Sequence, residues 1–178
     1  QNGDGVIDLN DRVNLGNPIP DATMGLNISF DYKNIDFSAY TFASIGNEIV
    51  RNYERNQQLV NKPIWYLDRW TGEGTSNTSP LQTIGATSNT DFSDFYVEDG
   101  SFVRLQNVQL GYTFSDNVLN NEKISKLRIY VSANNLFTLT KYRGYDPTIG
   151  NGAPIGGGID NGFYPSASTF LLGLNVKF

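Results

Sequence analysis

The sequence predicts an all-β fold in which long antiparallel strands cross a membrane as the C-terminal segment of a large β-barrel. Three observations support this prediction. Apolar and polar residues alternate over five segments, the connections between these segments differ strongly in length, and the last segment ends in the aromatic residue Phe178. Alternation with a period of two places successive side chains on opposite faces of a strand.

Each of the five segments is predicted to be a strand because it has one apolar face. In the first, the even positions from Met24 to Tyr32 are apolar and the positions between them are small or polar. Tyr40 and Phe42 blur the pattern of the second. In the third, the apolar positions change phase, which predicts a β-bulge near Arg104 to Asn107. The predicted strands span residues 23–32, 35–45, 101–114, 127–139 and 169–178.

The connections between the strands are of two kinds. Residues 33–34 and 115–126 form short connections, whereas residues 46–100 and 140–168 are long and rich in Gly, Asn, Ser and Thr. The strand order places the short connections on one side and the long ones on the other, as transmembrane barrels do. Apolar and charged residues at mixed spacing between Asn47 and Arg69 predict one or two short helices in the first long loop, interrupted at Pro63.

Alternation alone leaves a second architecture open, because the strands of a soluble β-sandwich also have one apolar face. Several of the predicted strands reach the roughly 9–11 residues that a tilted membrane strand needs, above the ~5–6 residues of typical globular strands. Strand length and the terminal aromatic residue therefore favour the membrane barrel.

The composition argues against catalysis and against nucleic-acid binding. The 178 residues include no His and no Cys, which removes most nucleophilic triads and most zinc or iron sites. Two carboxylate pairs, Glu98 with Asp99 and Asp91 with Asp94, lie in polar sequence and are predicted to belong to a solvated loop or an ion site rather than to an acid–base pair. A net charge of −5 does not suit a nucleic-acid surface. We therefore expect a protein that is not an enzyme.

The start of the chain contains a candidate calcium loop. Asn2 to Asp11 resembles an EF-hand or dockerin loop, in which oxygen ligands lie at positions 1, 3, 5, 7, 9 and 12 and a Gly lies at position 6. With Gly5 at position 6, the predicted ligands are Asn2, Asp4, the carbonyl of Val6, Asp8 and Asp11. Position 1 would precede Gln1, and an Asx- and Gly-rich turn without an ion is the alternative.

The chain has no run of 18 apolar residues and no signal peptide. It begins inside the candidate calcium loop, so we expect a piece of a longer protein.

An ordered series of motifs resembles the C-terminal region of SusC/RagA-type TonB-dependent transporters. The first covers Asn2 to Arg12 and continues through Leu15 to Asp21, and the series departs from the family at Ser166 to Ser168, where a basic residue is common. The other matching stretches are residues 96–105, 107–108, 110–114, 127–142, 144–147, 164–165 and 169–178. The resemblance covers nearly the whole chain.

This resemblance implies an importer in the outer membrane of a Gram-negative bacterium. The barrel of such a protein has roughly 22 strands around a plug. The plug lies N-terminal to the barrel, couples to the TonB complex and is absent from this chain. A SusD-like surface lipoprotein covers the extracellular side of the barrel. The substrate would be an oligosaccharide or a peptide, and the apolar strand faces would contact membrane lipid. Residues 1–22 would be an extracellular loop and residues 23–178 the last five strands of the barrel.

Two sets of residues are candidates for contacts that such a protein makes. Flat aromatic side chains next to polar groups suit sugar stacking, but they also suit packing of the loops onto each other or onto the lid. These residues are Trp65, Tyr66, Trp70, Tyr142 and Tyr145. The last strand resembles the signal that barrel-assembly machinery reads, through Phe170, Leu172, Leu174, Val176 and Phe178. A soluble calcium-dependent carbohydrate-binding β-domain is the alternative function.

Overall fold

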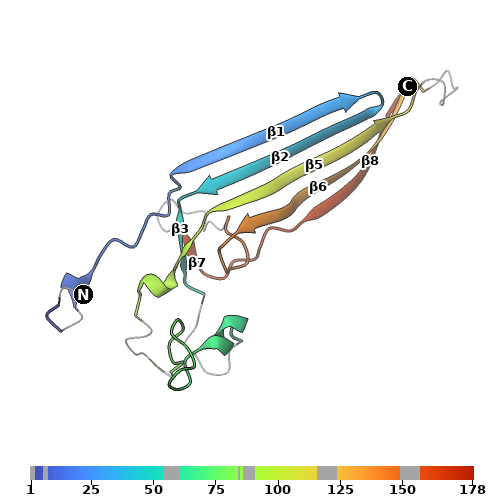
Figure 1. Cartoon of the computed structure of the whole chain (residues 1–178). Coiled ribbons are helices and arrows are strands. Elements are labelled where there is room, and N and C mark those ends of the chain that lie inside the picture. Colours follow the sequence, from blue (N-terminus) through green and yellow to red (C-terminus); the bar gives the residue numbers. More distant parts are fainter. Residues whose placement is uncertain are drawn as a thin grey trace.

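Five long antiparallel strands form one sheet, sheet A, and the long loops extend beyond one end of it (Figure 1). The computed structural model describes residues 3–5, 8–53, 61–83, 85, 91–115, 124–148 and 157–178. The strands of sheet A are β1 (Ala22–Tyr32), β2 (Ile35–Ile45), β5 (Phe102–Thr113), β6 (Lys126–Thr140) and β8 (Thr169–Lys177), in the order β1-β2-β5-β6-β8. Each begins and ends within one residue of the range that the alternation predicts.

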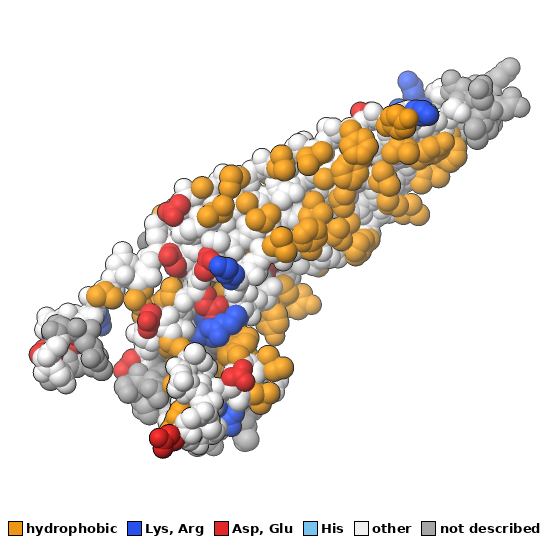
Figure 2. Space-filling model, in the orientation of Figure 1, with side chains coloured by type: hydrophobic (Ala, Val, Ile, Leu, Met, Phe, Trp, Pro, Cys, Tyr) orange, Lys and Arg blue, Asp and Glu red, His pale blue; other side chains and the backbone are white. Residues whose placement is uncertain are grey.

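The two faces of sheet A differ in chemistry, although Phe42, Phe102 and Leu171 lie on the mainly polar one. Residues directly opposite each other on antiparallel strands point to the same side, so the register assigns every side chain to a face. One face, called the apolar face, has Thr41 as its only polar side chain among the paired residues of sheet A. Figure 2 shows apolar side chains gathered along the length of this sheet. They include Met24, Leu26, Ile28, Phe30, Phe37, Leu110, Val131, Phe170, Leu172 and Leu174.

The predicted β-bulge is confirmed and explains the change of phase in β5. Tyr40 pairs with Asn107 while its neighbour Thr41 pairs with Leu105, so Gln106 has no opposite residue on β2. This extra residue keeps Leu105 and Val108 on the same face although they are three positions apart. The register toward β6 shifts at the same level, beside Asn135, whose φ is 51°.

The opposite face, called the polar face, places glycines beneath large side chains. A Cβ at Gly173 would overlap the ring of Tyr130, its direct partner on β6. At Gly111, a Cβ would collide with the ion pair between Asp36 and Arg128, which crosses from β2 to β6 over β5. The absence of a side chain at these two positions therefore lets the larger groups lie along the sheet.

The connections lie at opposite ends of sheet A (Figure 1). The hairpin turn at Lys33 and Asn34 lies at the same end as the C-terminus, whereas the two long loops gather at the other end around a second, three-stranded sheet, sheet B. Its strands are β3 (Glu48–Arg51), β4 (Val97–Asp99) and β7 (Ile159–Asp160), in the order β4-β3-β7. No helix within the described residues is long and apolar enough to cross a bilayer.

Sheet B corrects part of the prediction for the first long loop. Ile49 and Val50, predicted in a helix, lie in β3, because pairing with β4 and β7 outweighs the weak local pattern. The short helices among the described residues are 3-10 turns: η2 (Ile64–Asp68) and η4 (Asp94–Tyr96) in the first long loop, and η1 (Leu9–Asp11) near the start of the chain. Pro63 precedes η2 instead of interrupting a helix, as its fixed φ allows at a helix start. Leu59 and Val60, assigned to the same predicted helices, lie outside the described residues.

We predict that Gly173→Ala destabilises the protein by about 1–3 kcal/mol, because the new methyl group must displace the Tyr130 ring from the sheet. The thermal midpoint of the intact protein measures this. Gly72→Ala is the matched control, since a Cβ at Gly72 meets nothing within 4 Å. Equal midpoints for the two variants would contradict the prediction.

Candidate functional site

The two long loops meet around sheet B, and their described parts form the candidate functional site. Strands β3 and β4 belong to the first loop and β7 to the second, so the pairing of β3 with β7 joins the loops directly. Two backbone hydrogen bonds extend this pairing: Val50 N–H donates to the Gly158 carbonyl at 2.7 Å and Asn52 N–H to the Asp160 carbonyl at 2.8 Å. The site is therefore shared between segments more than 100 residues apart.

Glu98 lies at the centre of a cluster of charges. Its side chain is 9 % exposed, and its Oε1 lies 3.2 Å from Arg51 Nε and 2.6 Å from Arg143 Nη2. The backbone N–H of Arg143 donates to Oε2 at 3.0 Å. The Arg51 side chain is fully buried and also donates to the Phe95 carbonyl at 2.8 Å. The solvated loop predicted for Glu98 is wrong, because Arg143 of the second loop lies against the carboxylate, whereas the alternative of an ion site stays a prediction.

Trp65 completes this cluster. The guanidinium carbons of Arg51 and Arg143 lie 5.7 and 5.6 Å from its ring centroid, within the range of a cation–π contact. The Tyr53 ring packs edge-on against Trp65 with centroids 6.5 Å apart. These contacts attach the segment around η2 to both arginines.

A second buried carboxylate, Asp160, organises the turn after β7. Tyr142 Oη donates to Asp160 Oδ2 at 2.5 Å, and the Gly162 N–H donates to Oδ1 at 2.8 Å. Burial of the phenol, together with its hydrogen bond to the carboxylate, raises the pKa of Tyr142 above its usual value. Tyr142 is 5 % exposed, so it is part of the packed interior of the loops.

Asp146 anchors the second loop to the wall of sheet A. Its Oδ1 accepts from Arg104 Nη2 of β5 at 2.6 Å and from Thr148 Oγ1 at 2.7 Å, and its Oδ2 accepts from the Ser166 N–H at 2.9 Å. Burial alone would raise the pKa of Asp146, but the hydrogen bonds from Arg104, Ser166 and Thr148 outweigh it and hold the pKa below its usual range.

The predicted contact aromatics fall into two groups. Trp65 and Tyr142 pack inside the loops, as described above. Tyr66 lies beneath Lys62, whose Nζ is 5.1 Å from the ring centroid. Tyr145 is 80 % exposed and Trp70 is 38 % exposed. The structure therefore leaves Tyr145 and Trp70 as the two candidates with substantial surface for a partner or substrate.

The candidate calcium loop lies only partly within the described residues. Asn2 and Val6 lie outside them, and Asp4 lies between Gly3 and Gly5, which both have positive φ. Asp8 caps η1: it accepts from the Asn10 N–H at 2.7 Å, and its own N–H donates to Asp11 Oδ2 at 3.0 Å. No cluster of three or more potential metal-binding acidic side chains occurs in the described part of the chain.

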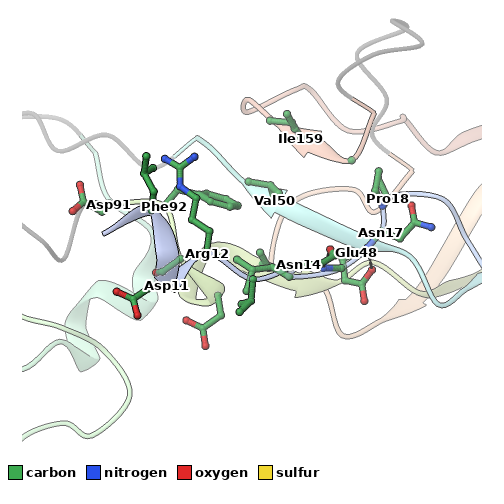
Figure 3. A pocket seen from close by; sticks show the side chains of 18 of the residues that line it. Asp11, Arg12, Asn14, Asn17, Pro18, Glu48, Val50, Asp91, Phe92 and Ile159 are labelled. Atoms are coloured by element: carbon green, nitrogen blue, oxygen red, sulfur yellow. Dashed lines mark hydrogen bonds between the residues drawn. The ribbon is translucent and has the colours of Figure 1, made fainter. Parts of the chain in front are cut away.

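An open groove of about 1400 Å³ is lined by the N-terminal arm (residues 8–18) and by residues of sheet B (Figure 3). Val50, Val97 and Ile159 contribute apolar lining from sheet B, and Glu48 is joined to the arm by a 2.6 Å hydrogen bond from the Asn17 N–H. The acidic residues that line the groove are Asp8, Asp11, Glu48, Asp91 and Asp94.

The residues of the predicted assembly signal lie on and beyond β8. Phe170, Leu172, Leu174 and Val176 lie on the apolar face, opposite apolar residues of β6. Phe178 follows the end of β8 and is 85 % exposed.

We predict that Asp146→Asn removes an acid-dependent part of the stability. Because the pKa of Asp146 is lowered on folding, its contribution is complete above the unfolded pKa of about 3.9 and is lost as the pH falls toward the folded value. The variant should be destabilised by roughly 3–5 kcal/mol near neutral pH, since Arg104 loses a buried partner. The difference between the thermal midpoints of the variant and the wild type should be constant from about pH 6 to about pH 4 and should begin to narrow below about pH 4. Asp91→Asn, at an exposed position, is the matched control and should keep the wild-type midpoint near neutral pH.

Comparison with known proteins identifies relatives over the whole chain, although no family model matches it. The chain is 35 % identical over 190 residues to TonB-dependent receptor P26 of Formosa agariphila, covering 100 % of this chain and 19 % of the relative. It is 34 % identical over 182 residues to the TonB-dependent receptor SusC of Bacteroides thetaiotaomicron, covering 100 % of this chain and 17 % of that protein. The chain thus spans about a fifth of the length of the curated relatives that it matches.

The fold has a counterpart among solved structures. The chain superimposes on the RagAB peptide importer in its open-open state with a TM-score of 0.72, at 25 % identity over 92 % of this chain and 18 % of that one. The closed-closed state gives a TM-score of 0.72 at 26 % identity. These relatives decide between the two architectures that the alternation leaves open, in favour of transmembrane barrel strands. The chain belongs to the SusC/RagA-type TonB-dependent receptors and corresponds to their C-terminal barrel portion.

Proposed function

We propose that this chain is part of an outer-membrane importer of a Gram-negative bacterium that takes up oligosaccharides or peptides. The observation that carries the proposal is the two-faced sheet, with a continuous apolar face for membrane lipid and a polar face for the interior of the barrel. The relatives support transport rather than catalysis, because they are TonB-dependent receptors and a peptide importer.

The same relatives support two partners. SusC and the RagAB importer point to a SusD-like surface lipoprotein over the extracellular side. Energy would come from the TonB complex through a plug that lies outside this chain. We place the two long loops on the extracellular side, because transmembrane barrels have short periplasmic turns and long extracellular loops.

Within the loops, we propose that Tyr145 and Trp70 contact the lipoprotein or the substrate. Both combine aromatic area with exposure, which suits sugar stacking and protein contacts. Trp65 contacts arginines of both loops, whereas Tyr142 binds Asp160 within the second loop and Tyr66 contacts Lys62 within the first. Phe178 and the apolar residues of β8 would serve membrane assembly.

We predict that the double variant Trp70→Ala and Tyr145→Ala loses at least about tenfold in uptake, or in recovery of the lipoprotein in the receptor complex, as expected for central aromatic contacts. Both quantities should be measured in the full-length receptor, with a heat-modifiable gel shift to verify assembly. Tyr142→Phe is the control, since it keeps the buried ring and loses only the hydroxyl. Wild-type uptake together with wild-type complex formation in the assembled double variant would contradict the assignment.

We also propose that the loop at residues 2–11 binds Ca²⁺ in the intact receptor. Support comes from the oxygen-bearing side chains at Asn2, Asp4, Asp8 and Asp11 and from the Gly5 turn, with the carbonyl of Val6 as a further ligand. Calorimetric titration of the full-length receptor with Ca²⁺ should show binding, and Asp4→Asn together with Asp8→Asn should weaken it by about tenfold or more. Absence of heat with the wild-type receptor would refute the proposal.

A further inference from the structure

The described parts of the two long loops are joined around a single carboxylate. Glu98 of the first loop receives Arg51 from its own loop and Arg143 from the second loop, and each guanidinium is within 3.2 Å of the same oxygen. Arg143 makes a further hydrogen bond to that oxygen through Nε at 2.8 Å. The second loop is thus held to the first by side-chain ion pairs in addition to the backbone pairing of β3 with β7.

The cluster depends on the charge of Glu98. Its carboxylate separates two guanidinium groups, of which Arg51 is fully buried. Without a negative charge on Glu98, the fully buried Arg51 would lose its carboxylate partner, and removing one partner of a buried pair is strongly destabilising. Arg143, whose side chain is 46 % exposed, would lose its ion pair with the first loop. Trp65 lies within cation–π distance of both cations, so the segment around η2 depends on the same charge.

The joined loops are also attached to the barrel wall. Arg104 of β5 binds Asp146, only three residues after Arg143, and also donates through Nε to Thr138 of β6 at 2.7 Å. Asp146 in turn accepts from the Ser166 N–H, near the start of β8. The second loop is therefore held to β5 through Asp146 and, three residues earlier, to the first loop through Arg143 and Glu98.

We propose that Glu98 is a positioning residue that fastens the two long loops into one body, so that a displacement of either loop is transmitted to the other. The surfaces of Tyr145 in the second loop and Trp70 in the first are then held in a fixed relation to each other. This inference rests on the contacts among Arg51, Glu98, Arg143 and Trp65 and does not require that the receptor transport any particular substrate.

Hydrogen–deuterium exchange of the full-length receptor, resolved to peptides, tests the proposal. Glu98→Gln keeps the shape of the side chain and removes its charge. Amide exchange should become about tenfold or more faster both in residues 61–70 of the first loop and in residues 142–148 and 157–163 of the second. Glu73→Gln, at an exposed position in the first loop, is the matched control and should leave both loops unchanged. Faster exchange confined to the neighbourhood of β4 would overturn the proposal.

The reciprocal variant keeps the test decisive if Glu98→Gln does not assemble. Arg143→Gln removes the contact from the side of the second loop and leaves the Glu98 pair with Arg51. The sequences of residues 61–70 and of β4 are unchanged in this variant. If the loops form one body, amide exchange should nevertheless accelerate there by a similar factor. Unchanged exchange in the first loop of this variant would also overturn the proposal. Uptake assays are not needed for either outcome, so failure here is distinguishable from failure of the proposed transport function.

Discussion

The two faces of sheet A have to remain separate along every strand, because one faces hydrocarbon and the other faces the interior of the barrel. Within a bilayer, every backbone N–H and C=O must also be paired inside the protein. Both conditions are met together only when the register between neighbouring strands preserves the period-two pattern. The bulge at Gln106 illustrates this constraint. The apolar residues of β5 change phase in the sequence at this position, and the extra residue keeps them on one face of the sheet. The ends of the strands fixed in this way determine where the two long loops begin and end.

The strands of sheet A could be predicted closely from the sequence because their signal is local. Alternation from Met24 to Tyr32, or from Val108 to Tyr112, is visible within a few residues and has one structural explanation. The bulge could also be predicted from the sequence, because the apolar positions change phase between Leu105 and Val108. What alternation could not provide was the choice between a sandwich and a membrane barrel. That choice came from the ordered motifs and the relatives over the full chain.

The loops were harder to predict, for a physical reason. The β3 strand forms because it pairs with β4 and β7, which lie far away in the chain, and its four residues have no pattern of their own. Glu98 was predicted to lie in a solvated loop or an ion site because its neighbours in the sequence are polar, whereas Arg143, 45 residues later, covers it. The same applies to the aromatic residues, since nothing in the sequence separates Trp65, packed between two arginines, from the exposed Tyr145. A buried ion pair between distant segments leaves no periodic signal.

The ring of Tyr130 rests on Gly173, and the Asp36–Arg128 pair spans Gly111 in the same way. A large side chain that lies along a barrel wall occupies less of the interior than one that projects from it. Each glycine on the polar face therefore makes the wall thinner at that level and widens the cross-section available to whatever fills or passes through the barrel. In this part of the wall, the internal diameter of the barrel depends on the positions of the glycines as well as on the side chains that project inward.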